Sequence, residues 1–429
     1  MDIQRNYLIF ATQISKVTTP KSPFYHRIIM KRFKIGLLAQ ILIAIALGIV
    51  SGQFMPSWIA GIFMTFNALF SQLLGFLVPL IIVGFVTPAI AEIGNRAGKV
   101  LLLTAAIAYV ATVGSGLLAY FTAETTFPCL ITPHSMDAAL ESGNEIAPYF
   151  TVTIPPMFGV MTALVFAFMA GIGIAYNQGT VLKQGAEEFR DIVAGTIRTV
   201  IIPLLPIYIF GIFMNMTMSG QVASVLTAFL KIIGIIFLMA AVILILQYCI
   251  AALFVKKNPF KLLYTMLPAY FTALGTQSSA ATIPVTLRQA IKMGVSEEIA
   301  GFVIPLCATI HMSGSTLKIV MCALALMIMQ GIPYDFSMFA GFIAMLAITI
   351  IAAPGIPGGA IMASLGLLGS MLGFNEQDQA LMIALYIAMD SFGTACNVTG
   401  DGFIALIVDK FFGKKVPNEA ELEEAILGK

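Results

Sequence analysis

Charge is scarce in this sequence. Only 10% of its 429 residues are Asp, Glu, Lys or Arg, whereas 59% are hydrophobic, and the mean hydropathy is +0.96. Soluble domains carry about 25% charged residues. The composition therefore excludes an ordinary soluble domain and predicts a membrane protein that crosses the bilayer several times.

Residue types that enzymes and metal sites need are also few. The sequence has three His and five Cys, and the cysteines follow no pairing pattern, so neither a disulfide framework nor a zinc site is expected. It contains no His-Glu-x-x-His or Gly-x-Ser-x-Gly motif. Isolated Lys and Arg at the ends of apolar segments do not make a nucleic-acid surface. We therefore expect a protein that is not an enzyme, needs no cofactor and binds no nucleic acid.

Long uncharged runs are what the sequence has instead. Residues 35–91 contain no charge at all, and the polar stretch Ser51–Trp58 divides them into two segments. Each segment is long enough for the roughly 20 residues with which a helix crosses a bilayer. The first six spans are expected at 33–54, 59–91, 99–122, 149–178, 188–218 and 221–254.

Two later uncharged stretches are interrupted. Residues 262–287 are rich in Ser, Thr, Ala and Gly and contain Pro284, and residues 336–375 contain Pro354-Gly-Ile-Pro-Gly-Gly359. A straight helix through these residues is disfavoured. Two re-entrant hairpins, at 258–291 and 336–373, fit better. Since irregular backbone at membrane depth must line a cavity or be buried in protein, both tips are expected to point at a site.

A weak internal repeat links the two hairpins. The first contains Ile283-Pro284 and precedes His311-Met-Ser-Gly-Ser315, and the second contains Ile356-Pro357 and precedes Asn397-Val-Thr-Gly-Asp401. Both five-residue motifs read polar, apolar, hydroxyl, Gly, polar. Interrupted segments in matching halves indicate the binding site of a secondary transporter. We expect the two halves to form an inverted repeat.

Positive charge lies on alternate loops. The loops near 55, 123–148, 219, 331–335 and 375–380 contain no Lys or Arg. This pattern predicts a multi-pass protein of the inner (plasma) membrane with both termini in the cytoplasm. The polar tails 1–30 and 416–429 flank the transporter domain 31–415, and Met30 is a plausible true start. The basic residues on the opposite loops are Lys31, Arg32, Lys34, Arg96, Lys99, Lys183, Arg190, Lys256, Lys257, Lys261, Arg288, Lys292, Lys410, Lys414 and Lys415.

Four polar residues share one face of the last apolar segment. Asp390, Thr394, Asn397 and Asp401 follow the spacing i, i+4, i+7, i+11, which places them on one side of a helix. A carboxylate in a spanning helix costs roughly 2.5–3.5 kcal/mol and is by default functional. This face therefore predicts one wall of a polar site within the membrane.

Three motifs together resemble a known family. Ser278-Ser-Ala-Ala-Thr-Ile-Pro-Val-Thr286, Gly355-Ile-Pro-Gly358 and Asn397-Val-Thr-Gly-Asp401 resemble the dicarboxylate/amino acid:cation symporters, relatives of the glutamate transporters, over about residues 31–415. The resemblance implies an all-α polytopic fold with eight transmembrane helices plus two re-entrant hairpins. It also implies a homotrimer in the lipid bilayer. Spans 1, 2, 4 and 5 would form a scaffold, and 99–122 with 221–413 a transport unit that slides as an elevator.

The resemblance also assigns roles within the site. Asp390 matches the acid that holds a substrate ammonium, and Asn397 matches a residue that contacts both substrate and sodium. Asp401 matches a sodium-ligating carboxylate. Further substrate-binding matches are Ser278, Ser279, Gly358 and Thr394. Backbone positions around sodium match Thr309, His311 and Met312.

Three departures from the family pattern bear on function. Acidic amino acid carriers of the family have Arg where this chain has Gly393, and the family's Asn-Met-Asp-Gly-Thr motif reads His311-Met-Ser313-Gly-Ser here. Lys318 stands in mid-membrane, where the family often has an aromatic residue. Lys318 is a candidate substrate-binding residue that clamps an anionic side chain, a built-in cation that neutralises Asp390 or Asp401, or a structural ion-pair partner. His311 either carries a coupling proton or replaces Asn in a hydrogen bond.

The expected function is symport of a small amino acid or dicarboxylate with a cation, sodium or proton. A neutral amino acid carrier for serine, threonine or alanine is the alternative. A remote alternative is an intramembrane aspartyl protease with Asp335 and Asp401 as its acids. Against it, Asp335 lies in a loop and position 398 is Val, where such enzymes have Gly. A pure channel is a further alternative.

Overall fold

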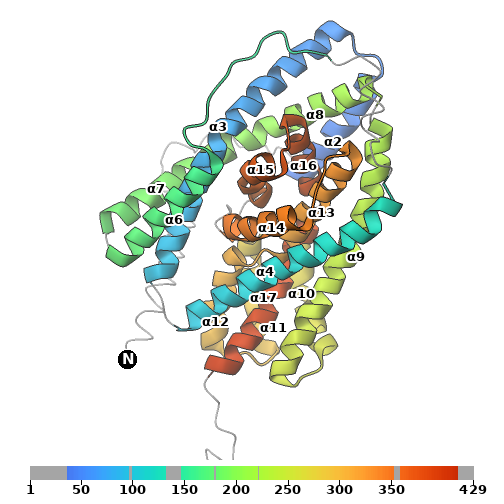
Figure 1. The fold of residues 1–429 in the computed structure, drawn as a ribbon. Coiled ribbons are helices and arrows are strands. Elements are labelled where there is room, and N and C mark those ends of the chain that lie inside the picture. The colour runs from blue at the N-terminus through green and yellow to red at the C-terminus, as the bar shows by residue number, and fades with distance from the viewer. Residues whose placement is uncertain are drawn as a thin grey trace, which may run out of the picture. The chain divides into compact units, whose positions relative to one another are not determined.

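The computed structural model describes residues 36–95, 99–131, 146–177, 180–220, 222–351 and 358–413 (Figure 1). Every regular element within these ranges is a helix, and no strand occurs among them. Four predicted features lie outside the described residues. They are the two polar tails, Met30, the basic residues at 31–34, 96 and 414–415, and the Gly355-Ile-Pro part of the second hairpin tip.

The first helices pack closely through small residues. α2 (Leu37–Gly52) lies against α8 (Ile202–Met218), and α3 (Ser57–Asn95) lies against α6 (Val160–Asn177). A Cβ on Gly48 would come within 2.7 Å of the Phe210 carbonyl oxygen. Glycine therefore lets the α2 and α8 backbones approach to a distance that larger residues forbid.

Two predicted spans differ from the structure. Residues 149–159 are not helical and α6 begins only at Val160, because Pro155-Pro156 lacks amide donors and restricts the preceding backbone. The span predicted at 188–218 starts earlier, at α7 (Thr180–Thr196), and continues through a π-helical turn, η2 (Ile197–Ile201), into α8. The predicted start of the fourth span is therefore wrong, and the fifth is longer than expected.

Apolar side chains face outward on the peripheral helices. α4 (Lys99–Thr126), which runs into the short turn η1 (Phe127–Cys129), and α9 (Val222–Val255) expose large hydrophobic residues, as α6 does. Seven described helical stretches are long and apolar enough to cross a membrane, and α2 is a shorter apolar helix. An apolar exterior around buried polar groups identifies a multi-pass membrane protein. Exposed examples are Leu102, Val110, Val165, Met169, Ile172, Leu230, Leu238 and Leu253.

The C-terminal half repeats one pattern, a helical hairpin followed by a broken helix. In the first copy α10 (Pro259–Thr276) and α11 (Ser279–Lys292) meet at Gln277-Ser278, and α12 (Glu297–Ile310) is separated from α13 (Ser313–Gln330) by two residues. The Ser-rich tip was expected. The prediction that Pro284 interrupts this stretch is wrong, because Pro284 lies inside α11.

The second copy has the same order of elements. α14 (Phe336–Ile351) and α15 (Gly359–Leu372) form the second hairpin, and Met389 separates α16 (Glu376–Ala388) from α17 (Asp390–Phe412). Gly358 precedes α15 with φ +76°, a conformation that favours glycine. Both helices that carry a polar motif are therefore broken.

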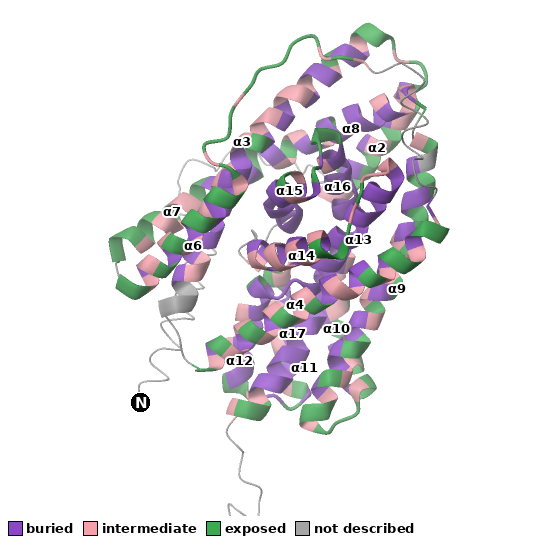
Figure 2. Ribbon diagram, viewed as in Figure 1, coloured by how far each residue is buried: buried purple, intermediate pink, exposed green. Residues whose placement is uncertain are grey.

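α13 and α17 form the centre of the molecule. Nearly every residue from Ser313 to Met329 and from Asp390 to Val408 is buried. α13 packs on α4, α9 and α17, and α17 packs on both helices of the first hairpin. Figure 2 shows buried residues concentrated on α13, α15 and α16. The polar residues on α13 and α17 are thus enclosed by protein.

Candidate functional site

Asn397 joins the two central helices. Its Oδ1 accepts hydrogen bonds from the backbone amides of Gly314, at 2.8 Å, and Ser315, at 3.3 Å. These amides lie in the first turn of α13, where helical N–H groups have no partner within the helix. The side chain of Asn397 therefore caps α13 from α17, which the spacing of the polar face did not indicate.

The amide nitrogen of Asn397 also has partners. It donates to Ser315 Oγ at 3.1 Å and contacts Met312 Sδ at 3.4 Å. Tyr386 donates its hydroxyl proton to the same Ser315 Oγ at 2.9 Å. Side-chain contacts from α16 and α17 thus hold the break between α12 and α13 in place.

A buried ion pair contacts the same tyrosine. Lys318 Nζ is 3.5 Å from Asp390 Oδ1, donates to the Met389 carbonyl oxygen at 3.2 Å and lies 3.8 Å from the centre of the Tyr386 ring. The other oxygen of Asp390, Oδ2, accepts from the Gly358 amide at 2.9 Å. Asp390 is therefore neutralised from α13 and held by the second hairpin.

A second polar cluster surrounds Asp401. His311 Nδ1 lies 3.1 Å from Asp401 Oδ1, and Gln247 on α9 donates to Ser313 Oγ at 3.2 Å and lies 3.5 Å from His311 Nε2. In this geometry Nδ1 can donate to Asp401 while Nε2 can accept from Gln247. Gln247 Oε1 and Thr399 Oγ1 are buried and have no hydrogen-bond partner among the described residues.

Seven of the eleven predicted site residues fall into two groups. The structure brings together Lys318, Gly358, Asp390 and Asn397, and separately His311 with Asp401; Met312 joins the first group, and Thr394 is buried on α17. Thr309 is exposed, and its hydroxyl bonds within α12, to Leu306. Ser278 Oγ accepts from the Ala281 amide, so its bond stays within the first hairpin, and Ser279 begins α11 at that tip.

Sequence reasoning missed two residues of the site. Tyr386 lies one helical turn before Asp390, and its ring and hydroxyl contact both Lys318 and Ser315. Gln247 is a buried amide in a strongly apolar helix. A polar side chain in such a run was the available signal for Gln247, because buried amides require hydrogen-bond partners.

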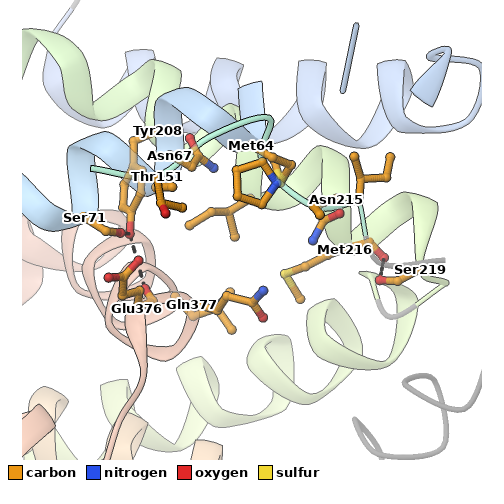
Figure 3. Close-up of a pocket in the computed structure, with 16 residues that line it drawn as sticks. Met64, Asn67, Ser71, Thr151, Tyr208, Asn215, Met216, Ser219, Glu376 and Gln377 are labelled. Atoms are coloured by element: carbon orange, nitrogen blue, oxygen red, sulfur yellow. Dashed lines mark hydrogen bonds between the residues drawn. The ribbon is translucent and has the colours of Figure 1, made fainter. Parts of the chain in front are cut away.

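A cavity of about 490 Å³ opens away from both clusters (Figure 3). It lies between α3, α8, the segment before α6 and the start of α16. Ser71 Oγ and Tyr208 Oη are hydrogen-bonded at 2.8 Å, and Tyr208 donates to the Glu376 carbonyl oxygen at 3.2 Å. None of the predicted site residues lines this cavity. Of the elements around the cavity, α3, α8 and the segment before α6 were expected in the scaffold, and α16 was expected in the transport unit.

Known proteins are similar to this chain over most of its length. The model of the sodium:dicarboxylate symporter family matches residues 37–411. A serine/threonine transporter, SstT, of Acinetobacter baylyi is 26% identical over 395 residues, which cover 88% of this chain and 98% of the relative. A serine/threonine transporter of the same name from Acinetobacter baumannii is 25% identical over 390 residues, which cover 88% and 97%.

Proposed function

The chain belongs to the sodium:dicarboxylate symporter family, and on that premise we propose that it is a sodium-coupled symporter for a small neutral amino acid of the serine or threonine type. Family membership confirms the resemblance drawn from the three motifs. It makes the chain a membrane transporter rather than an enzyme, which sets aside the aspartyl protease alternative.

One observation carries the choice of a neutral substrate. Lys318 is the only Lys or Arg that is buried in the described part of the chain, and Asp390 already pairs with it. A second carboxylate on the substrate would need another positive charge, since a buried charge without a partner is strongly unfavourable. Gly393 provides none. The relatives named as serine/threonine transporters support the same choice over an acidic amino acid or dicarboxylate.

Sodium coupling follows from the family, and the described residues suggest fewer sodium ligands than the family pattern has. Asn397, Asp401 and the irregular backbone at His311-Met312 provide oxygen ligands of the kind that hard cations prefer. Ser313 stands where the family has an acid, and His311 occupies one oxygen of Asp401. We infer fewer sodium ions per cycle than in relatives that carry that additional acid.

The architecture supports an elevator. We assign eight spans to α2, α3, α4, α6, α7–α8, α9, α12–α13 and α16–α17, with α10–α11 and α14–α15 as re-entrant hairpins. Two broken helices joined by Asn397, each preceded by a hairpin, suit a transport unit that moves as one body past α2, α3, α6 and α8. A homotrimer with both termini in the cytoplasm completes the proposal.

Uptake into proteoliposomes tests this function. Labelled serine, threonine, aspartate and succinate are offered with an inward sodium gradient, and separately with a proton gradient. We expect serine and threonine uptake that requires sodium. Asp390→Asn, reconstituted at the same density, is the control for specific uptake. Uptake of aspartate or succinate alone, or serine uptake driven only by protons, would overturn the proposal.

A further inference from the structure

The end of the first hairpin that lies opposite its tip carries only positive charge. The stretch 256–296 contains five basic residues and no Asp or Glu. We propose that this basic end is a docking surface for the acidic segment 419–424, which follows α17 in the same chain. The contact lies outside the substrate site and does not depend on which substrate is carried. The five basic residues are Lys256, Lys257, Lys261, Arg288 and Lys292.

The basic residues lie at the same end of the hairpin. α10 packs against α11, and Lys257 Nζ donates to the Met293 carbonyl oxygen at 2.7 Å, which joins the start of the hairpin to its end. Lys257 and Lys261 are four residues apart, as are Arg288 and Lys292. Like charges at this spacing on a helix repel each other. An anionic partner would relieve that repulsion on both helices at once.

These positive charges have no acidic partner within the described part of the chain. All five side chains are exposed, and none forms an ion pair there. Asp409, near the end of α17, accepts hydrogen bonds from the Ser296 amide at 3.0 Å and the Ser296 hydroxyl at 2.6 Å. Glu297 and Glu298 lie in the first turn of α12, where they complement the helix dipole. The neighbouring acids thus have other roles.

α17 ends next to this surface. It packs on both helices of the hairpin and ends at Phe412, and Figure 1 shows that end beside α11 and α12. The bonds between Asp409 and Ser296 fix the end of α17 there. Glu419 follows Gly413 by six residues, which span at most about 20 Å when extended. Packed helix axes are about 8–10 Å apart, so the acidic segment can reach the ends of both α10 and α11.

The acidic segment has the charge that the surface lacks. Four of the six residues in 419–424 are glutamates, and residues 416–429 contain a single Lys. One exposed ion pair contributes little, so docking requires several pairs together. Attachment to the same chain helps, because it gives the segment an effective concentration on the order of millimolar. Since exposed charges are screened by salt, the contact should weaken as the salt concentration rises. The glutamates are Glu419, Glu421, Glu423 and Glu424.

Disulfide formation in the full-length protein tests the docking. The five native cysteines are removed, and Phe260→Cys on α10 is combined with Ala420→Cys, which stands between two of the glutamates. Neither change removes a charge, and Phe260 is exposed beside Lys261. Tyr176→Cys with Ala420→Cys is the matched control, because Tyr176 is an exposed aromatic residue near the end of α6. An oxidant is applied for fixed times, and the remaining thiols are counted with a maleimide-linked polymer.

The pair at 260 and 420 is expected to oxidise at least about tenfold faster than the control pair at low salt, in line with its higher effective concentration. In about 1 M sodium chloride, where the Debye length is about 3 Å, most of this advantage should disappear. Replacing the four glutamates by Gln should have the same effect as salt. Arg288→Gln with Lys292→Gln should slow the reaction, whereas Lys183→Gln on α7 should not.

Carbodiimide coupling of the unmodified protein gives a second measurement that does not require the cysteine-free variant to fold. Mass spectrometry should find an amide between a glutamate of 419–424 and one of the hairpin lysines. Equal oxidation rates for the two cysteine pairs, rates that ignore both salt and the Glu→Gln changes, or the absence of that amide would overturn the proposal.

An anionic lipid is the competing occupant of a basic surface. The oxidation is therefore repeated in vesicles of phosphatidylcholine alone and in vesicles that also contain phosphatidylglycerol. A disulfide in both kinds of vesicle supports docking of the acidic segment. A disulfide that forms only without phosphatidylglycerol would assign the surface to the lipid headgroup and overturn the proposal, as would its failure to form in either.

Discussion

Gly393 on α17 lies directly against Lys318 on α13. A Cβ built on this glycine would be 2.4 Å from both Cε and Nζ of the lysine, closer than any non-bonded contact allows. A side chain at position 393 and the observed position of Lys318 therefore exclude each other. Because Gly393 has no side chain, it leaves room for the Lys318 ammonium. The positive charge of the site therefore comes from α13 rather than from α17.

Gly393→Ala is expected to reduce serine uptake by about tenfold or more, since displacing one partner of a buried pair costs at least about 1.4 kcal/mol. Initial rates in proteoliposomes measure this, and the loss should appear in KM. Gly234→Ala is the matched control, because a Cβ at this helical glycine meets nothing within 4 Å. Wild-type transport by Gly393→Ala would contradict the packing argument.

Moving the charge back to α17 is expected to change the substrate. The single variant Gly393→Arg should be inactive, because its side chain collides with Lys318. The double variant Gly393→Arg with Lys318→Tyr should recover transport and favour aspartate, as the resemblance to acidic amino acid carriers implies. Two residues in contact are not additive, so recovery by the second substitution is the diagnostic result. Competition of aspartate against labelled serine measures it.

His311 is placed to compete with a cation for Asp401. Its Nδ1 lies 3.1 Å from Asp401 Oδ1, and a hydrogen bond to a charged group contributes about 1.5–3 kcal/mol. His311→Asn, which restores the family's residue, is expected to lower the sodium concentration for half-maximal uptake about tenfold if 1.4 kcal/mol of competition is removed. Tyr248→Phe, which loses a bond to the Thr399 backbone instead, is the comparison. An unchanged or higher sodium requirement in His311→Asn would refute this role.

Much of the site was predictable because its signals are local. The spacing from Asp390 to Asp401 is set by helical geometry alone, and α17 indeed carries all four polar residues. Gly and Pro also marked the second hairpin, because both residue types interrupt a helix. The helix break at Met389 gave no such signal, and Pro284 gave a misleading one, because α11 continues through this proline.

The relationships between helices were not predictable. The sequence placed Lys318 near the site, but it left three roles open, since the distance to Gly393 depends on how α13 packs on α17. Gln247 and Tyr386 enter the site from α9 and α16 for the same reason. Tertiary packing decides which polar residues come into contact, and the local residue pattern of a single sequence does not show how the helices pack.

The proposed elevator mechanism predicts that α16 moves past α3. In this structure Gln72 on α3 donates to Glu376 Oε1 on α16 at 3.2 Å, and both side chains are accessible. We replace both by Cys in a variant whose five native cysteines are removed, and join them with a short bifunctional thiol reagent. Uptake should stop in the joined protein and persist in each single-Cys control treated alike, because only a covalent link between the two bodies blocks sliding. A cleavable reagent should allow recovery on reduction. Full uptake by completely joined protein would show that α16 does not leave α3 during transport.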